Sequence, residues 1–261
     1  MVSPVTIDVP RVAGCSREEL ERRFVEPGRP VILEGVATSW EASRRWTLPY
    51  LREAFGGAEV QVMRAPRGKV DTSGNGGTTY DPTTIGAYID ALLGGASDPG
   101  YLSTMWDTLP AGLRAEVPWP SLCGEPPFRQ STLWLGPAGI VSPMHFDVAD
   151  NLYVVVRGKK RFTLVAPRES LRVYPHGPFS RLGQYARLDP ERAEAFPRYA
   201  GAHPQIAELG DGDALYLPRF WWHHARGLDL TMAVNFWWGN GMYAAMALAA
   251  DGWKRLRGLS R

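Results

Sequence analysis

Hydrophobic positions in the second half of the chain fall into short, continuous apolar runs of the length of β-strands. Each run is rich in β-branched and aromatic residues, which pack well on a pleated surface. The five runs are residues 132–135, 152–156, 162–165, 214–217 and 232–237. Turn residues separate them, and the Arg-Gly-Lys-Lys sequence at 157–160 joins two of them as a hairpin. Short strands joined by tight turns favour an antiparallel sandwich or barrel.

The first half of the chain mixes helical and strand patterns. Ser16 stands before an acidic first turn and Thr47 before a Leu-Pro pair, and both are typical helix N-caps. Residues 30–33 and 60–63 have the pattern of short strands, whereas residues 67–81 are rich in Gly, Ser and Thr and predict a loop. We therefore expect a mixed α/β region in front of the strand-rich one.

Composition adds that the chain can fold as a soluble globular protein. Of its 261 residues, 44% are hydrophobic and 21% are charged, which is enough to bury a sizeable core. The formal net charge of +2 gives no reason to expect a nucleic acid or a membrane surface as a partner. No apolar run approaches membrane-spanning length, and the first ten residues lack a signal-peptide core. Cys15 and Cys123 alone encode neither a disulfide framework nor a thiolate zinc site, so we expect a cytoplasmic protein.

The first candidate for chemistry is His145-Phe146-Asp147, directly in front of a predicted strand. In an extended chain, residues i and i+2 point to the same face, so an imidazole and a carboxylate can bind one metal ion together. Such a pair often arises by chance, and a histidine beside a helpful carboxylate explains it equally well. A third ligand is needed to decide.

A third ligand is available at the end of the segment 213–224, where a strand, a proline turn and aromatic residues lead into His223 and His224. Antiparallel pairing across a barrel could bring His223 beside His145 and Asp147. Two imidazoles and one carboxylate on one face of a metal ion leave three positions open, which is the arrangement of non-haem Fe(II) oxygenases. Strand alternation points the two adjacent histidines in opposite directions, so we expect only one of them to be a ligand.

Such a metal site needs a co-substrate that fits its open positions. 2-Oxoglutarate fills two of them through its 2-keto acid, and its far carboxylate requires a cation and hydroxyl donors. Lys160 lies on the hairpin after the first ligand strand and is well placed to be that cation. In isolation, Gly-Lys-Lys-Arg would be an ordinary exposed turn, but the metal motif favours the functional interpretation.

Beyond these motifs, the chain resembles a known family, the JmjC oxygenases. The resemblance is carried by residues 134–161, which contain His145, Asp147 and Lys160, and by residues 212–238, which contain the distal histidine. It is a resemblance to the hydroxylase branch that includes the asparaginyl hydroxylase factor-inhibiting HIF. The first half agrees with it, because residues around 29–35 are similar to the entry strand of that branch.

The resemblance implies the fold and its parts. We expect a mainly β fold, a double-stranded β-helix (a cupin-like jelly roll) with surrounding helices, in a single domain over residues 1–261. Within it we expect a mixed α/β part over residues 1–130, a jelly-roll core over residues 131–240 and a C-terminal helix over residues 241–261. A packed terminal helix is the simpler interpretation of the last part, and a homodimer contact is the alternative.

The family pattern makes His145, Asp147 and His223 the iron ligands and pairs Lys160 with the 5-carboxylate of 2-oxoglutarate. The implied activity is hydroxylation of an amino-acid side chain in a protein or peptide, which consumes 2-oxoglutarate and O2 and releases succinate and CO2. Two alternatives stay open: a tailoring hydroxylase of a peptide-like natural product, and a metal-dependent cupin enzyme that does not use 2-oxoglutarate.

The resemblance extends to further residues of the site. Tyr101 and Ser142 would donate hydroxyl hydrogen bonds to the co-substrate. Many members carry Thr where this chain has Ser142, and the hydroxyl is kept. The remaining implied residues are Asn151 and Asn235, against the co-substrate and metal, and Trp134 and Trp237, at the substrate pocket.

Overall fold

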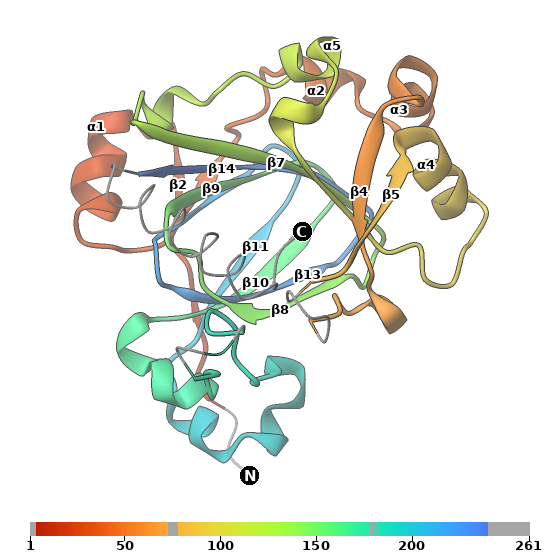
Figure 1. The fold of residues 1–261 in the computed structure, drawn as a ribbon. Helices are drawn as coiled ribbons and strands as arrows, with labels where there is room; N and C mark the ends of the chain where they lie inside the picture. Colours follow the sequence, from red (N-terminus) through yellow and green to blue (C-terminus); the bar gives the residue numbers. More distant parts are fainter. Residues whose placement is uncertain (1–3, 73–77, 178–179, 181, 240–261) are drawn as a thin grey trace.

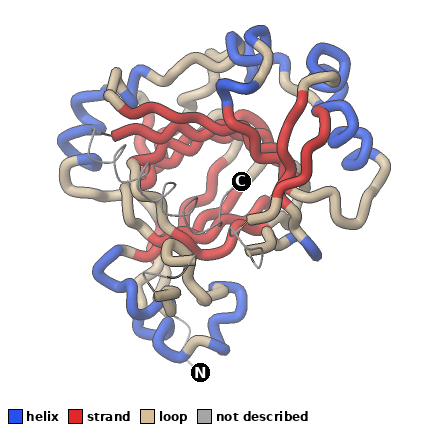
Figure 2. The backbone as a smooth tube through the Cα atoms, in the orientation of Figure 1, coloured by secondary structure: helices blue, strands red, loops and turns tan. Residues whose placement is uncertain are grey.

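The computed structural model of the chain describes residues 4–72, 78–177, 180 and 182–239. In this part of the chain, two β-sheets surround a common interior, and the helices lie outside them (Figures 1 and 2). The C-terminal helix expected over residues 241–261 lies outside the described residues. None of the helices that are described has the length and hydropathy needed to span a bilayer.

The smaller sheet has five described strands in the order β1-β11-β10-β13-β8. Its bounds are β1 (Ile7–Asp8), β8 (Val141–His145), β10 (Lys160–Val165), β11 (Gln205–Leu209) and β13 (Trp222–Gly227). All neighbours pair antiparallel except β1, which runs parallel to β11.

The larger sheet has nine described strands in the order β2-β3-β12-β9-β14-β7-β6-β4-β5. Their bounds are β2 (Arg11–Ala13), β3 (Val31–Glu34), β4 (Glu59–Met63), β5 (Tyr80–Thr84), β6 (Tyr101–Met105), β7 (Phe128–Gly136), β9 (Asp150–Arg157), β12 (Ala214–Leu217) and β14 (Thr231–Gly239). The strands of the first half thus extend both edges of a sheet whose centre comes from the second half.

Strands β7 to β14 give the molecule its topology. They divide into β12-β9-β14-β7 in the larger sheet and β11-β10-β13-β8 in the smaller one, and the chain passes repeatedly between the two. This is a double-stranded β-helix, so the predicted mainly β, jelly-roll fold is confirmed. The short apolar runs of the second half predicted it, and strands such as β9 and β12 are indeed buried on both faces.

Short helices cover the outer face of the larger sheet (Figure 1). They are α1 (Arg17–Leu20), the π turn η1 (Glu21–Val25), α2 (Glu41–Arg45), α3 (Leu48–Phe55), α4 (Ile85–Leu93) and α5 (Ala111–Ala115). Ser16 and Thr47 accept hydrogen bonds from backbone N–H groups three residues on, so both predicted N-caps are present. Trp46 and Leu113 from this layer share one buried cluster with strand residues of the larger sheet.

Residues 166–204, between β10 and β11, form a segment of short 3-10 helices packed against the outer side of the smaller sheet (teal in Figure 1). The 3-10 helices of the described residues are η2 (Pro66–Gly68), η3 (Trp106–Thr108), η4 (Ser121–Cys123), η5 (Pro167–Val173), η6 (Pro190–Ala195) and η7 (Pro197–Gly201). Val173 and Leu188 of the segment bury themselves against Met144 and Trp222, which lie next to candidate ligands in the sequence. The segment therefore backs the strands that carry the site.

Candidate metal centre

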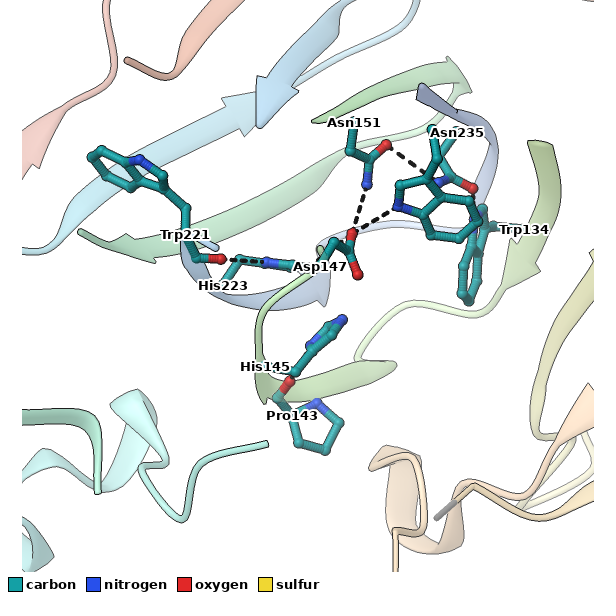
Figure 3. Close-up of polar contacts among 9 residues, drawn as sticks. Trp134, Pro143, His145, Asp147, Asn151, Trp221, His223 and Asn235 are labelled. Carbon is teal, nitrogen blue, oxygen red and sulfur yellow. Dashed lines mark hydrogen bonds and ion pairs between the residues drawn. The ribbon is translucent and has the colours of Figure 1, made fainter. Parts of the chain in front are cut away.

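Pairing of β8 with β13 brings the two candidate histidines together. His145 and His223 are directly opposite in the antiparallel register, and their ring centroids are 4.1 Å apart. Asp147 follows the end of β8, and its carboxylate lies on the same side (Figure 3). One donor atom from each of the three residues lies within 4.8 Å of the other two. The three residues chosen from the sequence thus form one cluster, here called the triad.

Both triad imidazoles are held by their own strands. The Nδ1 of His145 hydrogen bonds to the carbonyl of Pro143 at 2.7 Å, and the Nδ1 of His223 to the carbonyl of Trp221 at 3.0 Å. A carbonyl can only accept, so Nδ1 carries the proton and Nε2 is left with a lone pair. Burial and the neighbouring His145 lower the pKa of His223, which keeps its ring neutral. A neutral imidazole with a free Nε2 is the form that binds metals.

His224 points to the opposite face of β13, as strand alternation predicts. It pairs with Thr163 of β10, and its ring is buried toward Asp189 and Glu191 of the 166–204 segment. Burial lowers the pKa of His224 to about 4, and among the described residues its Nε2 has no hydrogen-bond partner. The structure therefore places His223 in the triad and His224 outside it.

A β-bulge in β8 turns both Ser142 and His145 toward the barrel interior. His145 pairs with His223, but Ser142 pairs with Ala225, so three steps on β8 match two on β13. Directly opposed residues of antiparallel strands share a face, and Ala225 belongs to the interior cluster. Ser142 and His145 therefore lie on the same side, although strict alternation would separate them.

The backbone of Asp147 is held by the turn that precedes β13. The N–H of Phe220 donates to the carbonyl of Asp147 at 2.7 Å. Phe220 has a φ of 66°, in the left-handed region that is costly for a bulky side chain. This strain sits at the contact between the two ligand-bearing segments, where the surrounding structure must compensate for it.

Hydrogen bonds among four side chains of the larger sheet lead to the carboxylate of Asp147 (Figure 3). Its Oδ2 accepts from the indole Nε1 of Trp237 at 2.8 Å and from the amide of Asn151 at 3.1 Å. The oxygen of Asn151 accepts from the amide of Asn235 at 3.2 Å. The oxygen of Asn235 in turn accepts from the indole of Trp134 at 2.7 Å.

Lys160 is fully buried in the same barrel. Its Nζ donates to the hydroxyl of Tyr101 at 2.5 Å and to that of Tyr153 at 2.9 Å. Burial lowers the pKa of Lys160 to about 7, and it raises the pKa of both tyrosines. The ring of Tyr101 lies 5.1 Å from that of Trp134, so contacts run without a break from Lys160 to the residues around the triad.

Comparison with known proteins supplies the family. The profile of the cupin-like domain family matches residues 17–242, a span that contains the whole triad and Lys160. The chain belongs to the cupin-like domain family. The double-stranded β-helix described above is the fold that this membership requires.

Several characterised relatives of this cupin-like chain cover most of its length. Lysine-specific demethylase 8 of Xenopus tropicalis is 30% identical over 239 residues, which is 88% of this chain and 52% of the relative. The human bifunctional peptidase and (3S)-lysyl hydroxylase JMJD7 is 30% identical over 252 residues, 83% of this chain and 79% of the relative. Human tRNA wybutosine-synthesizing protein 5 is 25% identical over 255 residues, 89% and 78% respectively. The cupin-like chain thus spans about half the length of demethylase 8.

Two residues beside the cupin-like site were not selected from the sequence. The hydroxyl of Tyr153 accepts a hydrogen bond from Lys160, as the hydroxyl of Tyr101 does. The signal for it was present, because Tyr153 is two residues after Asn151 on one strand and must face the same way. Tyr185 of the 166–204 segment stacks on the ring of His145 at 5.5 Å. No periodicity in that segment indicates which strand it contacts.

Proposed function

We propose that this protein is an Fe(II)- and 2-oxoglutarate-dependent oxygenase that hydroxylates an amino-acid side chain of a protein or peptide. The observation that carries the proposal is the buried Lys160, held by two phenols in the same barrel as the triad. Among the described residues, no carboxylate pairs with this lysine. A buried cation without an anion is costly, and a carboxylate-bearing ligand would remove that cost.

The donor set of the triad fits iron(II). His145 and His223 present neutral Nε2 atoms and Asp147 presents a carboxylate, which is the set that leaves open positions for co-substrate and O2. When bound, iron with 2-oxoglutarate supplies the oxidant that converts a C–H bond into an alcohol, with release of succinate and CO2. The protein holds the ligands, excludes water and orients the C–H bond.

The co-substrate carboxylate would be received by three groups. Lys160 supplies the ammonium, and Tyr101 and Tyr153 supply hydroxyl donors once the lysine turns from them to the carboxylate. Ser142 faces the same interior from β8 and would add a fourth donor. Trp134, whose ring packs on Tyr101, would form the wall between the co-substrate and the substrate.

The substrate class is supported by the relatives. One is named a (3S)-lysyl hydroxylase and another a lysine-specific demethylase, and both names describe action on an amino-acid side chain. We propose a protein or peptide side chain for this chain on that basis.

The test is an anaerobic titration of the Fe(II)-loaded protein with 2-oxoglutarate, followed by visible absorption. We expect a charge-transfer band in the wild type, no band in His223→Ala, and a band that needs far more 2-oxoglutarate in Lys160→Ala. His224→Ala is the matched control, because it removes the adjacent histidine from the other face of β13. A wild type that binds iron but gives no band would contradict the proposal and leave a cupin enzyme of another chemistry.

A positive titration justifies a substrate screen. Peptides incubated with the loaded protein and 2-oxoglutarate under air should gain about 16 Da, the mass of one oxygen atom. A protein that consumes 2-oxoglutarate but modifies only peptide-like small molecules would keep the chemistry and refute the substrate class.

A further inference from the structure

The hydrogen bonds that lead to Asp147 have a direction fixed from both ends. An indole N–H can only donate, and an ionised carboxylate can only accept. Trp134 therefore requires the oxygen of Asn235, which turns the amide NH2 of Asn235 toward Asn151 (Figure 3). The oxygen of Asn151 is then occupied, and its NH2 is left to donate to Asp147. Rotating either amide by 180° would break two bonds.

Both lone-pair sites of one carboxylate oxygen are used. Oδ2 of Asp147 accepts from Trp237 and from Asn151, and an oxygen of a carboxylate has two such sites. The Nε2 of His223 is 3.9 Å from Oδ2, beyond hydrogen-bonding distance. The other oxygen, Oδ1, accepts no hydrogen bond from the described residues and points toward the ring of His145 (Figure 3).

We infer that Trp237 is a positioning residue which, together with the Trp134–Asn235–Asn151 series, holds Asp147 so that it offers a single oxygen to a metal ion. The inference rests on the proposed function insofar as it takes the triad to bind metal. Hydrogen bonds to a carboxylate are stronger than those between neutral groups, so two of them on Oδ2 resist rotation of the side chain. A carboxylate that turned freely could present both oxygens and occupy a position that the co-substrate needs.

This inference gives Trp237 a role other than that of a pocket wall. Trp237 lies on β14 opposite Gln130 of β7. Of the two hydrogen bonds to Oδ2 of Asp147, the one from the indole of Trp237 is the shorter. Replacing the ring by phenyl keeps most of the apolar surface and removes the donor. Trp237→Phe therefore isolates the hydrogen bond from the packing.

The experiment is a titration of the metal-free chain of residues 1–261 with Co(II) alone, followed by calorimetry and by visible absorption. Partners that orient metal ligands typically contribute 10–100-fold in metal affinity. We expect Trp237→Phe to weaken Co(II) binding by about tenfold or more and to alter the absorption of the bound ion, which reports its coordination. The unfolding midpoint of the metal-free variant should stay close to that of the wild type.

The matched control is Trp222→Phe. Its indole also donates one hydrogen bond, to Ser170 at 2.8 Å, and it adjoins His223 in the sequence, but it lies on the outer side of the smaller sheet. We expect Co(II) affinity to be unchanged in this variant. Equal losses in both variants, or a loss that follows a lower unfolding midpoint, would overturn the inference. So would unchanged affinity and absorption in Trp237→Phe.

A double-mutant cycle tests the series itself. Trp134 acts on Asp147 only through the amides, so Trp134→Phe should weaken Co(II) binding in the wild type but not in Asn151→Ala. The effects of Trp134→Phe and Trp237→Phe should not simply add, because both routes end on Oδ2 of Asp147. If Trp134→Phe changes Co(II) affinity by the same factor in the wild type and in Asn151→Ala, the series does not hold Asp147.

The two proposals fail separately. If Co(II) binds as described but 2-oxoglutarate produces no charge-transfer band with iron, the proposed function fails and the positioning role stands. If the band appears and the Trp237→Phe affinity is that of the wild type, the positioning role fails and the proposed function stands.

Discussion

Lys160 lies in an environment that is unfavourable to its own charge. Its side chain is fully buried, and its described partners are two phenol hydroxyls rather than an anion. Burial lowers the pKa of Lys160 to about 7, compared with about 10.4 for a lysine in an unfolded chain. The charged form of this residue therefore lowers the stability of the ligand-free protein. Two predictions follow from this at the scale of one side chain.

The first prediction concerns stability. Lys160→Met should raise the stability of the ligand-free protein by on the order of 2 kcal/mol, or roughly 4–8 °C in melting temperature. Tyr101 and Tyr153 keep a partner in the variant, because their hydroxyls are 3.3 Å apart. The gain should be full below pH 7 and vanish as the pH approaches 10.4, because the unfolded chain then also loses the lysine proton. Thermal melts of the two proteins between about pH 6 and about pH 10.4 test this prediction. A variant less stable than the wild type below pH 7 would contradict it.

The second prediction concerns the pH dependence of co-substrate binding. Under the proposed function, the carboxylate of 2-oxoglutarate would need the ammonium form of Lys160, which the free protein holds below pH 7 and loses above it. The affinity of the metal-loaded protein should therefore fall as the pH rises from 7 to 9, by up to about tenfold per unit. Lys160→Arg should show a flat profile, because guanidinium stays charged. Equal slopes in the two proteins, measured by calorimetry, would refute the assignment.

At the scale of elements, the ligand strand β8 has a partner on both sides. β13 pairs with one edge, and residues 184–186 pair with the other through the N–H groups of Phe146 and Ala186. Tyr185 stacks on His145 there and hydrogen bonds to Thr78 from the first half of the chain. The 166–204 segment is thus fastened to the strand that carries the first ligand.

We expect Tyr185→Ala to loosen this segment. Removing a largely buried ring that contacts two other parts of the chain lowers the cost of local opening. Tryptic cleavage after Arg187 should become at least about tenfold faster, while the global unfolding midpoint changes little. Leu171→Ala is the control within the segment, since Leu171 is 74% exposed. Cleavage at the wild-type rate would show that Tyr185 does not anchor the segment.

The same elements show what could be predicted from the sequence. The triad was predictable because His145 and Asp147 share a face at i and i+2, and because a second strand is followed by a proline turn and aromatic residues that lead into His223. The bulge that brings Ser142 to the interior was not, because a bulge changes register without a mark in the hydrophobic pattern. The contact of Tyr185 depends on a long irregular connection, where neither period nor capping specifies a partner.

At the scale of the molecule, β14 joins the first half of the chain to the site. Asn235 and Trp237 face inward to Asp147, and Phe236 between them faces outward. Phe236 packs edge-on against Trp40 at 6.0 Å and against Trp119 at 5.5 Å, both from the first half. The helical layer therefore fixes the strand that orients the metal ligand.

Replacing Phe236 should consequently affect both stability and the site. Phe236→Leu loses two aromatic contacts, about 1–3 kcal/mol of stability, and should also weaken Co(II) binding because its strand neighbours shift. Ile89→Val on α4 is the control, since it lies in the same cluster and costs about 1 kcal/mol. Its Co(II) affinity should match the wild type. If both variants bind Co(II) equally well, the outer layer supports the fold but not the site.

Under the proposed function, the two histidines held by backbone carbonyls would also determine how the protein acquires its metal. Because these hydrogen bonds do not depend on an ion, a chelator should empty the site without unfolding the chain. A site prepared in advance adapts little to the ion it meets, so intrinsic affinity follows the general order of the divalent series, in which copper and zinc outrank iron. Which ion occupies the site is then decided by metal supply and exchange rate, and zinc should inhibit the protein by taking the place of iron.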